Sequence, residues 1–155
     1  ADLDPKQRVK WAGPDMSVRS SITARQMEHW AHGQEVFDLF GVERNNTDRI
    51  RNIVVLGVNT FGWTFKVRGE EPPGEMPRLV LNAPSGAVWE YGESDMDLVT
   101  GCAVEFCQVV TQTRNIADTE LKVSGPVAGE WMAKAQCFAG AQETPPAAGT
   151  RVRVQ

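Results

Sequence analysis

The longest regular pattern of apolar and polar positions runs from residue 15 to residue 40. Ser17 is a suitable N-cap, and Gly41 follows the segment where a glycine often ends a helix. Trp30 and Phe37 are seven residues apart and therefore share one helix face. The pattern predicts an amphipathic helix of about 22 residues. On the flank of its apolar face we expect Ile22 and Phe40.

A second helical pattern covers residues 47–65, after a turn-forming sequence at residues 45–48. We expect Gly57 and Gly62 to allow close packing against a neighbouring element. Residues 69–74 are rich in Gly, Glu and Pro, which is typical of a linker. The apolar spacing that predicts the helix is set by Ile50, Ile53, Val54, Gly57, Val58, Phe61 and Phe65.

The pattern changes after this linker. Residues 78–83 and 87–91 favour strands around a Pro-Ser-Gly turn, which predicts a β-hairpin. A helix is expected over residues 97–111, a short strand over 120–123 and a last helix over 126–138. The predicted organisation is a helical part at residues 1–68, a linker at 69–76, a small α+β domain at 77–140 and a mobile tail at 141–155.

Composition and charge limit the class of protein. The chain has 155 residues, of which 41% are hydrophobic and 23% charged, as in soluble globular proteins. Its apolar runs are too short to span a bilayer. The 16 Lys and Arg against 20 Asp and Glu give a net charge of −4, which argues against nucleic-acid binding. We therefore expect neither a membrane nor a nucleic acid as partner.

The cysteines and the N-terminus add two expectations. Cys102, Cys107 and Cys137 are an odd number in a chain long enough to form a core, which favours free buried thiols and a cytoplasmic location. The sequence begins at Ala1 without the pattern of a signal peptide. We expect a fragment, or one chain of a processed protein.

The best candidates for a catalytic or metal-binding role lie on the first predicted helix. Glu28 and His32 are four residues apart, so their side chains lie one turn apart on one face. A carboxylate and an imidazole at this spacing can form half of a divalent-metal site. The same spacing also occurs on ordinary solvated helix faces. His29 points to the flank of the apolar face, where a structural role is expected.

The sequence around this pair resembles a bacterial metal-binding family related to mycothiol-dependent maleylpyruvate isomerase. The resemblance is strongest at residues 23–36, Thr-Ala-Arg-Gln-Met-Glu-His-Trp-Ala-His-Gly-Gln-Glu-Val. It continues in order through residues 47–51, 56–58, 71–73, 83–86, 99–101, 105–107, 110–114 and 117–119. It implies an α+β chain: the last long helix of a DinB-type four-helix bundle, followed by a small α+β domain of sterol-carrier-like type.

The resemblance also implies a site. Glu28 and His32 would bind a divalent metal, usually Zn²⁺, and a low-molecular-weight thiol such as mycothiol would be the cofactor. Glu35 stands where the family usually has Asp, and we expect Glu35 and Arg25 to orient the substrate or the ligands. Trp11 is expected to line the cofactor pocket. The family's earlier helices and their His ligand are missing, so we expect a second chain to supply them.

Two functions remain open from the sequence. The first is a subunit of a metal-dependent isomerase, transferase or hydrolase that acts on a small molecule, with its site completed by the partner chain. The second is a non-catalytic module that binds a metal or a small apolar or anionic ligand. Three protein ligands and an exchangeable water would favour catalysis, whereas a closed or empty site would favour binding.

Overall fold

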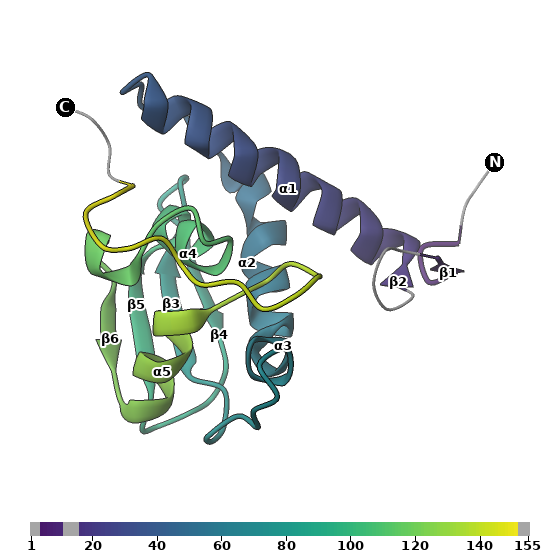
Figure 1. Ribbon diagram of the computed structural model, residues 1–155, viewed down its shortest axis with the longest axis vertical. Coiled ribbons are helices and arrows are strands. Elements are labelled where there is room, and N and C mark those ends of the chain that lie inside the picture. Colours follow the sequence, from purple (N-terminus) through teal and green to yellow (C-terminus); the bar gives the residue numbers. More distant parts are fainter. Residues whose placement is uncertain (1–3, 11–15, 152–155) are drawn as a thin grey trace.

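A computed structural model describes residues 4–10 and 16–151. A short strand pair, β1 (Arg8–Val9) and β2 (Met16–Ser17), precedes the long helix α1 (Val18–Leu39). Two helices follow, α2 (Arg51–Asn59) and α3 (Phe61–Lys66). The remaining chain forms strands β3 to β6 and helices α4 and α5 (Figure 1). The architecture is α+β, as expected.

Helix α1 has the predicted length and ends. The Ser17 hydroxyl oxygen accepts a hydrogen bond from the backbone N–H of Ser20 at 3.1 Å, which caps the first turn. Gly41 has a φ of 63° and donates its N–H to the carbonyl of Asp38, while Val42 donates to Phe37. This pair of bonds is a Schellman motif, in which glycine avoids the strain of a left-handed backbone.

The apolar face of α1 was predicted only in part. Trp30 is buried and Phe37 is half-buried, but Ile22 and Phe40 are 63% and 74% exposed. Helix α1 packs on α2, and its buried residues are Ala24, Met27, Trp30 and Gln34. In Figure 1, α1 crosses one end of the molecule, and its N-terminal half extends beyond the other helices and the sheet.

The second helical segment begins with a 3₁₀ turn at Asp48–Ile50, which leads into α2. The segment is then interrupted at Thr60, which separates α2 from α3. Gly57 packs closely as predicted, because a Cβ there would lie 2.9 Å from Cε1 of Phe106. The same expectation for Gly62 was wrong, since a Cβ built there would meet no described atom within 4 Å beyond its chain neighbours and the nearby helix backbone.

The sheet consists of four strands in the order β4-β3-β5-β6. Strands β3 (Arg78–Asn82) and β4 (Val88–Tyr91) form the predicted antiparallel hairpin. Strand β6 (Lys122–Ser124) pairs antiparallel with β5 (Leu98–Cys102), which lies parallel to β3. Leu79, Leu81 and Val99 are fully buried in the core.

The helix predicted over residues 97–111 begins later than expected. Residues Leu98–Cys102 form β5, and only Ala103–Val110 form helix α4. Pairing with β3 and β6 satisfies the backbone hydrogen-bonding groups of residues 98–102. These partners are distant in the chain, so the local pattern did not predict the strand. The last helix, α5 (Pro126–Lys134), also ends four residues before the predicted boundary at Phe138.

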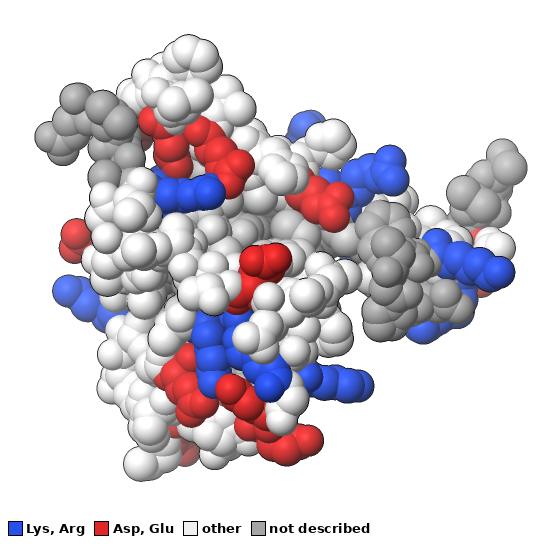
Figure 2. All heavy atoms as spheres, viewed as in Figure 1, with Lys and Arg blue, Asp and Glu red and all other residues white. Residues whose placement is uncertain are grey.

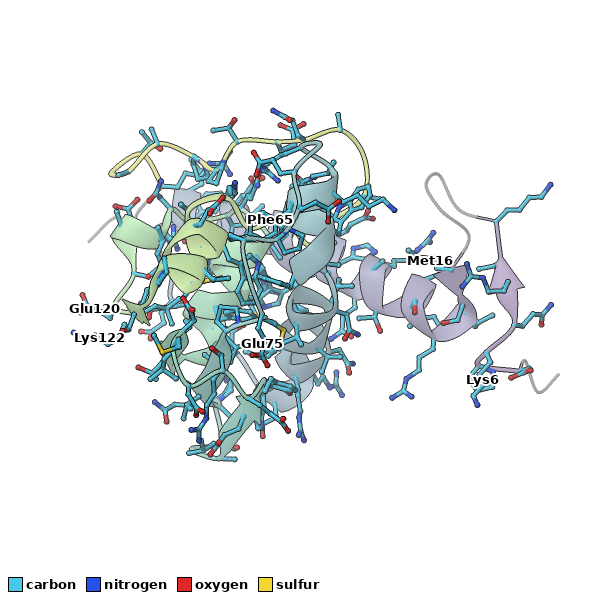
Figure 3. All side chains as sticks on the ribbon, turned by 90° about the horizontal axis from the view of Figure 1, so that it is seen from below. Lys6, Met16, Phe65, Glu75, Glu120 and Lys122 are labelled. Carbon is cyan, nitrogen blue, oxygen red and sulfur yellow. The ribbon has the colours of Figure 1, made fainter. Side chains whose placement is uncertain are left out.

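One core joins the two parts of the chain. Its buried cluster contains Ile53 and Val54 of α2, Phe65 of α3, and residues of β3, α4 and α5. Figure 3 shows Phe65 inside this body, whereas Met16 lies toward the N-terminal end of α1. The segment after Gly140 has no helix or strand up to Arg151, but it is held by hydrogen bonds, including one from Asn115 Nδ2 to the carbonyl of Pro146.

Candidate metal-binding helix and adjoining cavity

Helix α1 presents Glu28 and His32 on successive turns, and both residues are exposed. The helix fixes their spacing, because side chains at i and i+4 lie one above the other. Nδ1 of His32 lies 3.9 Å from Oε2 of Glu35. Three residues of the expected site, Glu28, His32 and Glu35, are therefore neighbours along one side of α1.

Glu35 has a second partner, because a guanidinium nitrogen of Arg151 donates a hydrogen bond to Oε1 of Glu35. This contact brings the segment after α5 to the C-terminal half of α1. Arg25 is exposed one turn before Glu28 and lines a shallow depression with Ser21, Ile22 and His29. The structure therefore does not bring Arg25 into contact with Glu35.

The other expected site residues are placed differently. Trp11 lies outside the described residues. His29 is exposed on α1. Arg114 is buried and forms an ion pair with Asp38 of α1 at 2.8 Å. On the face drawn in Figure 2, Lys and Arg side chains lie beside Asp and Glu side chains rather than in one positive patch.

The donor atoms fit two positions of a divalent-metal site. An imidazole nitrogen and a carboxylate oxygen are ligands that Zn²⁺ accepts, and both side chains are open to the surface of α1. Within residues 4–10 and 16–151, no group of three His, Cys, Asp or Glu side chains is arranged to hold a metal ion. Among the described residues, the site predicted from the sequence therefore has at most two ligands, Glu28 and His32.

A cavity of about 180 Å³ opens beside Glu28. It lies between α1, the α2–α3 segment and the residues that follow α5. Because Glu28 is exposed, its carboxylate stands at the opening. The lining residues are Met16, Ala24, Met27, Glu28, Leu56, Thr60, Trp63, Cys137, Phe138 and Ala139.

The polar groups of this lining mostly have partners within the protein. The Thr60 hydroxyl donates to the carbonyl of Leu56 at 2.7 Å, and the indole N–H of Trp63 donates to the carbonyl of Phe138 at 2.9 Å. Burial raises the pKa of the Cys137 thiol to about 12, so this thiol stays neutral at physiological pH. Within the described part of the lining, Glu28 is the residue that carries charge.

Sequence reasoning missed this cavity. Its walls come from segments more than 100 residues apart in the chain, such as Ala24 and Ala139. Most wall residues are apolar residues at buried or half-buried positions, as in any protein core. No local signal marks them as neighbours, so only the tertiary packing identifies the cavity.

Comparisons with known proteins support part of the expected relationship. Residues 1–37 match the family model described as the mycothiol maleylpyruvate isomerase N-terminal domain. This match relates the chain to that family and includes α1 up to Phe37, with Glu28, His32 and Glu35.

Two proteins of Mycobacterium tuberculosis, from two strains, are 44% identical to this chain over 135 residues. Both carry the name of uncharacterized proteins. The alignment covers 86% of this chain and 52% of each relative, so the chain spans about half the length of these curated relatives. No solved structure matches the chain. Among the described residues, no helix is both long and apolar enough to cross a membrane.

Proposed function

We propose that this chain is part of a metal-dependent enzyme, and that Glu28 and His32 bind the metal, with Zn²⁺ as the expected ion. The observation that carries the proposal is the position of the pair: both side chains are exposed on α1, and Glu28 stands at the opening of an apolar cavity. The family match over residues 1–37 supports it, because it contains both residues.

The chain's own groups suggest how the site is organised. Glu35 lies near Nδ1 of His32, and a carboxylate at this nitrogen would leave Nε2 as the ligand atom and fix the ring orientation. Arg25, on the outer side of α1, would orient a polar part of the substrate. A bound zinc ion would supply Lewis-acid chemistry and lower the pKa of a coordinated thiol.

The reaction class that we propose is isomerisation or group transfer that depends on a low-molecular-weight thiol such as mycothiol, or else hydrolysis. Two of the three cysteines are buried, and the exposed Cys102 does not line the cavity beside Glu28, which favours an external thiol. Cys107 and Cys137 are buried, and burial raises the pKa of both thiols, which keeps them protonated. The alternative is a non-catalytic binding module, which the apolar cavity would also serve.

The first test concerns the metal ligands. Elemental analysis of the protein purified from its own host should find about one metal per site, and Glu28→Gln or His32→Ala should lower that content at least tenfold because each removes a ligand. Circular dichroism should show that α1 still forms. His29→Ala is the matched control on the same helix and should keep the metal. Unchanged metal content in both ligand variants would contradict the assignment.

A cobalt-substituted sample separates the two functions. If the metal has an open position, adding a low-molecular-weight thiol should produce a thiolate-to-cobalt absorption band. A metal-loaded protein whose spectrum does not change with thiol would favour the binding module.

We further propose that additional helices cover the outer side of α1 and supply a third His ligand. Ile22, Val36 and Leu39 lie on α1 and are all more than half exposed. Apolar side chains repeated along one helix are typical of an interface. The helices would belong to a second chain or to sequence continuous with this one, and the length of the relatives is compatible with both.

Native mass spectrometry of the protein from its host tests this arrangement. We expect the described chain in a complex, or within a longer polypeptide, with about one bound metal. Sedimentation of residues 1–155 alone should show self-association, because the apolar side of α1 is then uncovered. A monomer of these residues that unfolds cooperatively would refute the need for further helices.

A further inference from the structure

The cavity beside Glu28 has a lining that defines the chemistry of its occupant. Its walls are mainly the hydrocarbon and aromatic parts of Met, Ala, Leu, Trp and Phe side chains. The donor groups of Thr60 and Trp63 are occupied by backbone carbonyls. An occupant would therefore find little hydrogen bonding inside, and its affinity would come from removing apolar surface from water.

The size of the cavity sets the size of the occupant. Its volume is about 180 Å³. An apolar cavity of roughly 150 Å³ in another protein binds benzene. The space beside α1 thus suits one six-membered ring or a branched chain of comparable volume.

The charge at the opening sets a further limit. Among the described residues that line the cavity, Glu28 carries the only charge, and none is Lys, Arg or His. An anionic group inside would lose hydration without gaining a cationic partner, and it would be repelled by the Glu28 carboxylate.

We propose that this cavity binds an uncharged apolar group of the size of one aromatic ring, and that the polar end of the same ligand lies outside it at Glu28 and His32. The part of the inference that concerns the reacting end rests on the proposed function. The part that concerns the cavity stands on its lining alone. The cavity lining would therefore favour a substrate with an apolar group at this position over a substrate with an anionic group there.

The methyl groups of the methionines provide a direct measurement. Met16 and Met27 line the cavity, whereas Met96 is exposed elsewhere and Met132 lies in the core. In ¹H–¹³C spectra of the complete protein as purified, benzene should shift the methyl signals of Met16 and Met27 and leave that of Met96 unchanged. Benzoate is the matched anionic probe, and we expect it to bind at least tenfold more weakly.

Two variants test whether the probe sits in this cavity. Ala139→Phe, at an exposed position of the lining, should weaken benzene binding at least tenfold because the new ring fills the space. Ala133→Phe, at an exposed position of α5 outside the lining, is the control and should change nothing. Glu28→Gln should lower the ratio of benzene affinity to benzoate affinity several-fold, because the carboxylate that repels benzoate is removed.

The outcomes separate this inference from the proposed function. If saturating benzene leaves Met16 and Met27 unaffected, or if benzoate binds as well as benzene, the apolar assignment is wrong, whatever the metal content. If benzene binds as expected but the Glu28 and His32 variants keep their metal, the metal-site proposal fails and the cavity assignment stands.

Discussion

Cys107 and Cys137 show how position alone changes the chemistry of a side chain. Both are fully enclosed, and burial penalises the charged thiolate, which raises both pKa values. Cys102 was also expected to be buried, but it is exposed at the N-cap of α4. The cysteine that borders the cavity, Cys137, is therefore a neutral wall group and not a nucleophile.

This burial predicts a pH dependence of stability. The Cys137 thiol has a pKa of about 12 when folded, against 9.0 for an unperturbed thiol. Between these values the native chain keeps a proton that the unfolded chain loses, so stability falls as pH rises above about 9, by about 1.4 kcal/mol per pH unit for one such group. Urea unfolding at several pH values, with reductant present, should give a smaller slope for Cys137→Ala.

The exposed Cys102 gives the matched control, Cys102→Ala, which removes a thiol without removing a buried one. Only the slopes are compared, because Cys137→Ala also changes packing. Equal slopes for Cys137→Ala and the unmodified chain would show that burial of this thiol does not contribute to the alkaline loss of stability.

Helices α2 and α3 illustrate two different uses of glycine within neighbouring elements. In α2, Gly57 allows α4 to approach, because a Cβ at this position would lie 2.9 Å from Phe106 and 3.1 Å from Val110. In α3, Gly62 faces open space. A helical glycine lowers intrinsic helix stability wherever it occurs. At Gly57 close packing against α4 explains this cost, whereas at Gly62 no packing contact does.

Substitution by alanine should therefore have opposite effects at these two positions. Gly57→Ala should lower the free energy of unfolding by about 1–2 kcal/mol, because overpacking against α4 outweighs the gain in helix propensity. Gly62→Ala should raise it by about 0.5–1 kcal/mol, through propensity alone. Urea unfolding measures both. A stabilising Gly57→Ala would mean that α2 and α4 can separate at little cost.

The attachment of α1 to the rest of the protein depends on contacts between distant segments. The Arg114 guanidinium donates to both carboxylate oxygens of Asp38, at 2.8 and 2.9 Å, and also to the carbonyl of Arg151. The indole N–H of Trp30 donates to Asn46 Oδ1 at 2.9 Å. These bonds, with the α1–α2 packing, hold α1 in place over the core that α2 shares with the sheet.

Removing the Arg114 side chain should therefore destabilise the protein. The side chains of Arg114 and Asp38 are only 7% and 15% exposed, so Arg114→Met would leave a buried carboxylate without its partner and cost about 3 kcal/mol. The matched control is Arg78→Met, because the Arg78–Glu90 pair is about half exposed and should contribute less than about 1 kcal/mol. Equal unfolding midpoints for the two variants would contradict a structural role of the buried pair.

The local sequence was sufficient for several elements. Ser17 and Gly41 marked both ends of α1, and the Pro-Ser-Gly turn located the β3–β4 hairpin, because capping and turn chemistry act over a few residues. The spacing of Glu28 and His32 followed from helix geometry alone. The division into two domains at residues 69–76 stays a prediction, as do the metal, the thiol and the partner.

Tertiary structure decided the remaining features, since they depend on contacts between distant segments. Leu98–Cys102 became a strand because β3 and β6 supply its hydrogen-bond partners. Ile22 is exposed and Gln34 is buried because the packing of α1 against the rest of the chain, rather than hydrophobicity, sets its inner side. The cavity beside Glu28 exists only where α1, α2–α3 and the segment after α5 meet. The sequence by itself therefore determined that Glu28 and His32 share one face of a helix, because helix geometry is local, whereas the packing of remote segments determined what lies next to them.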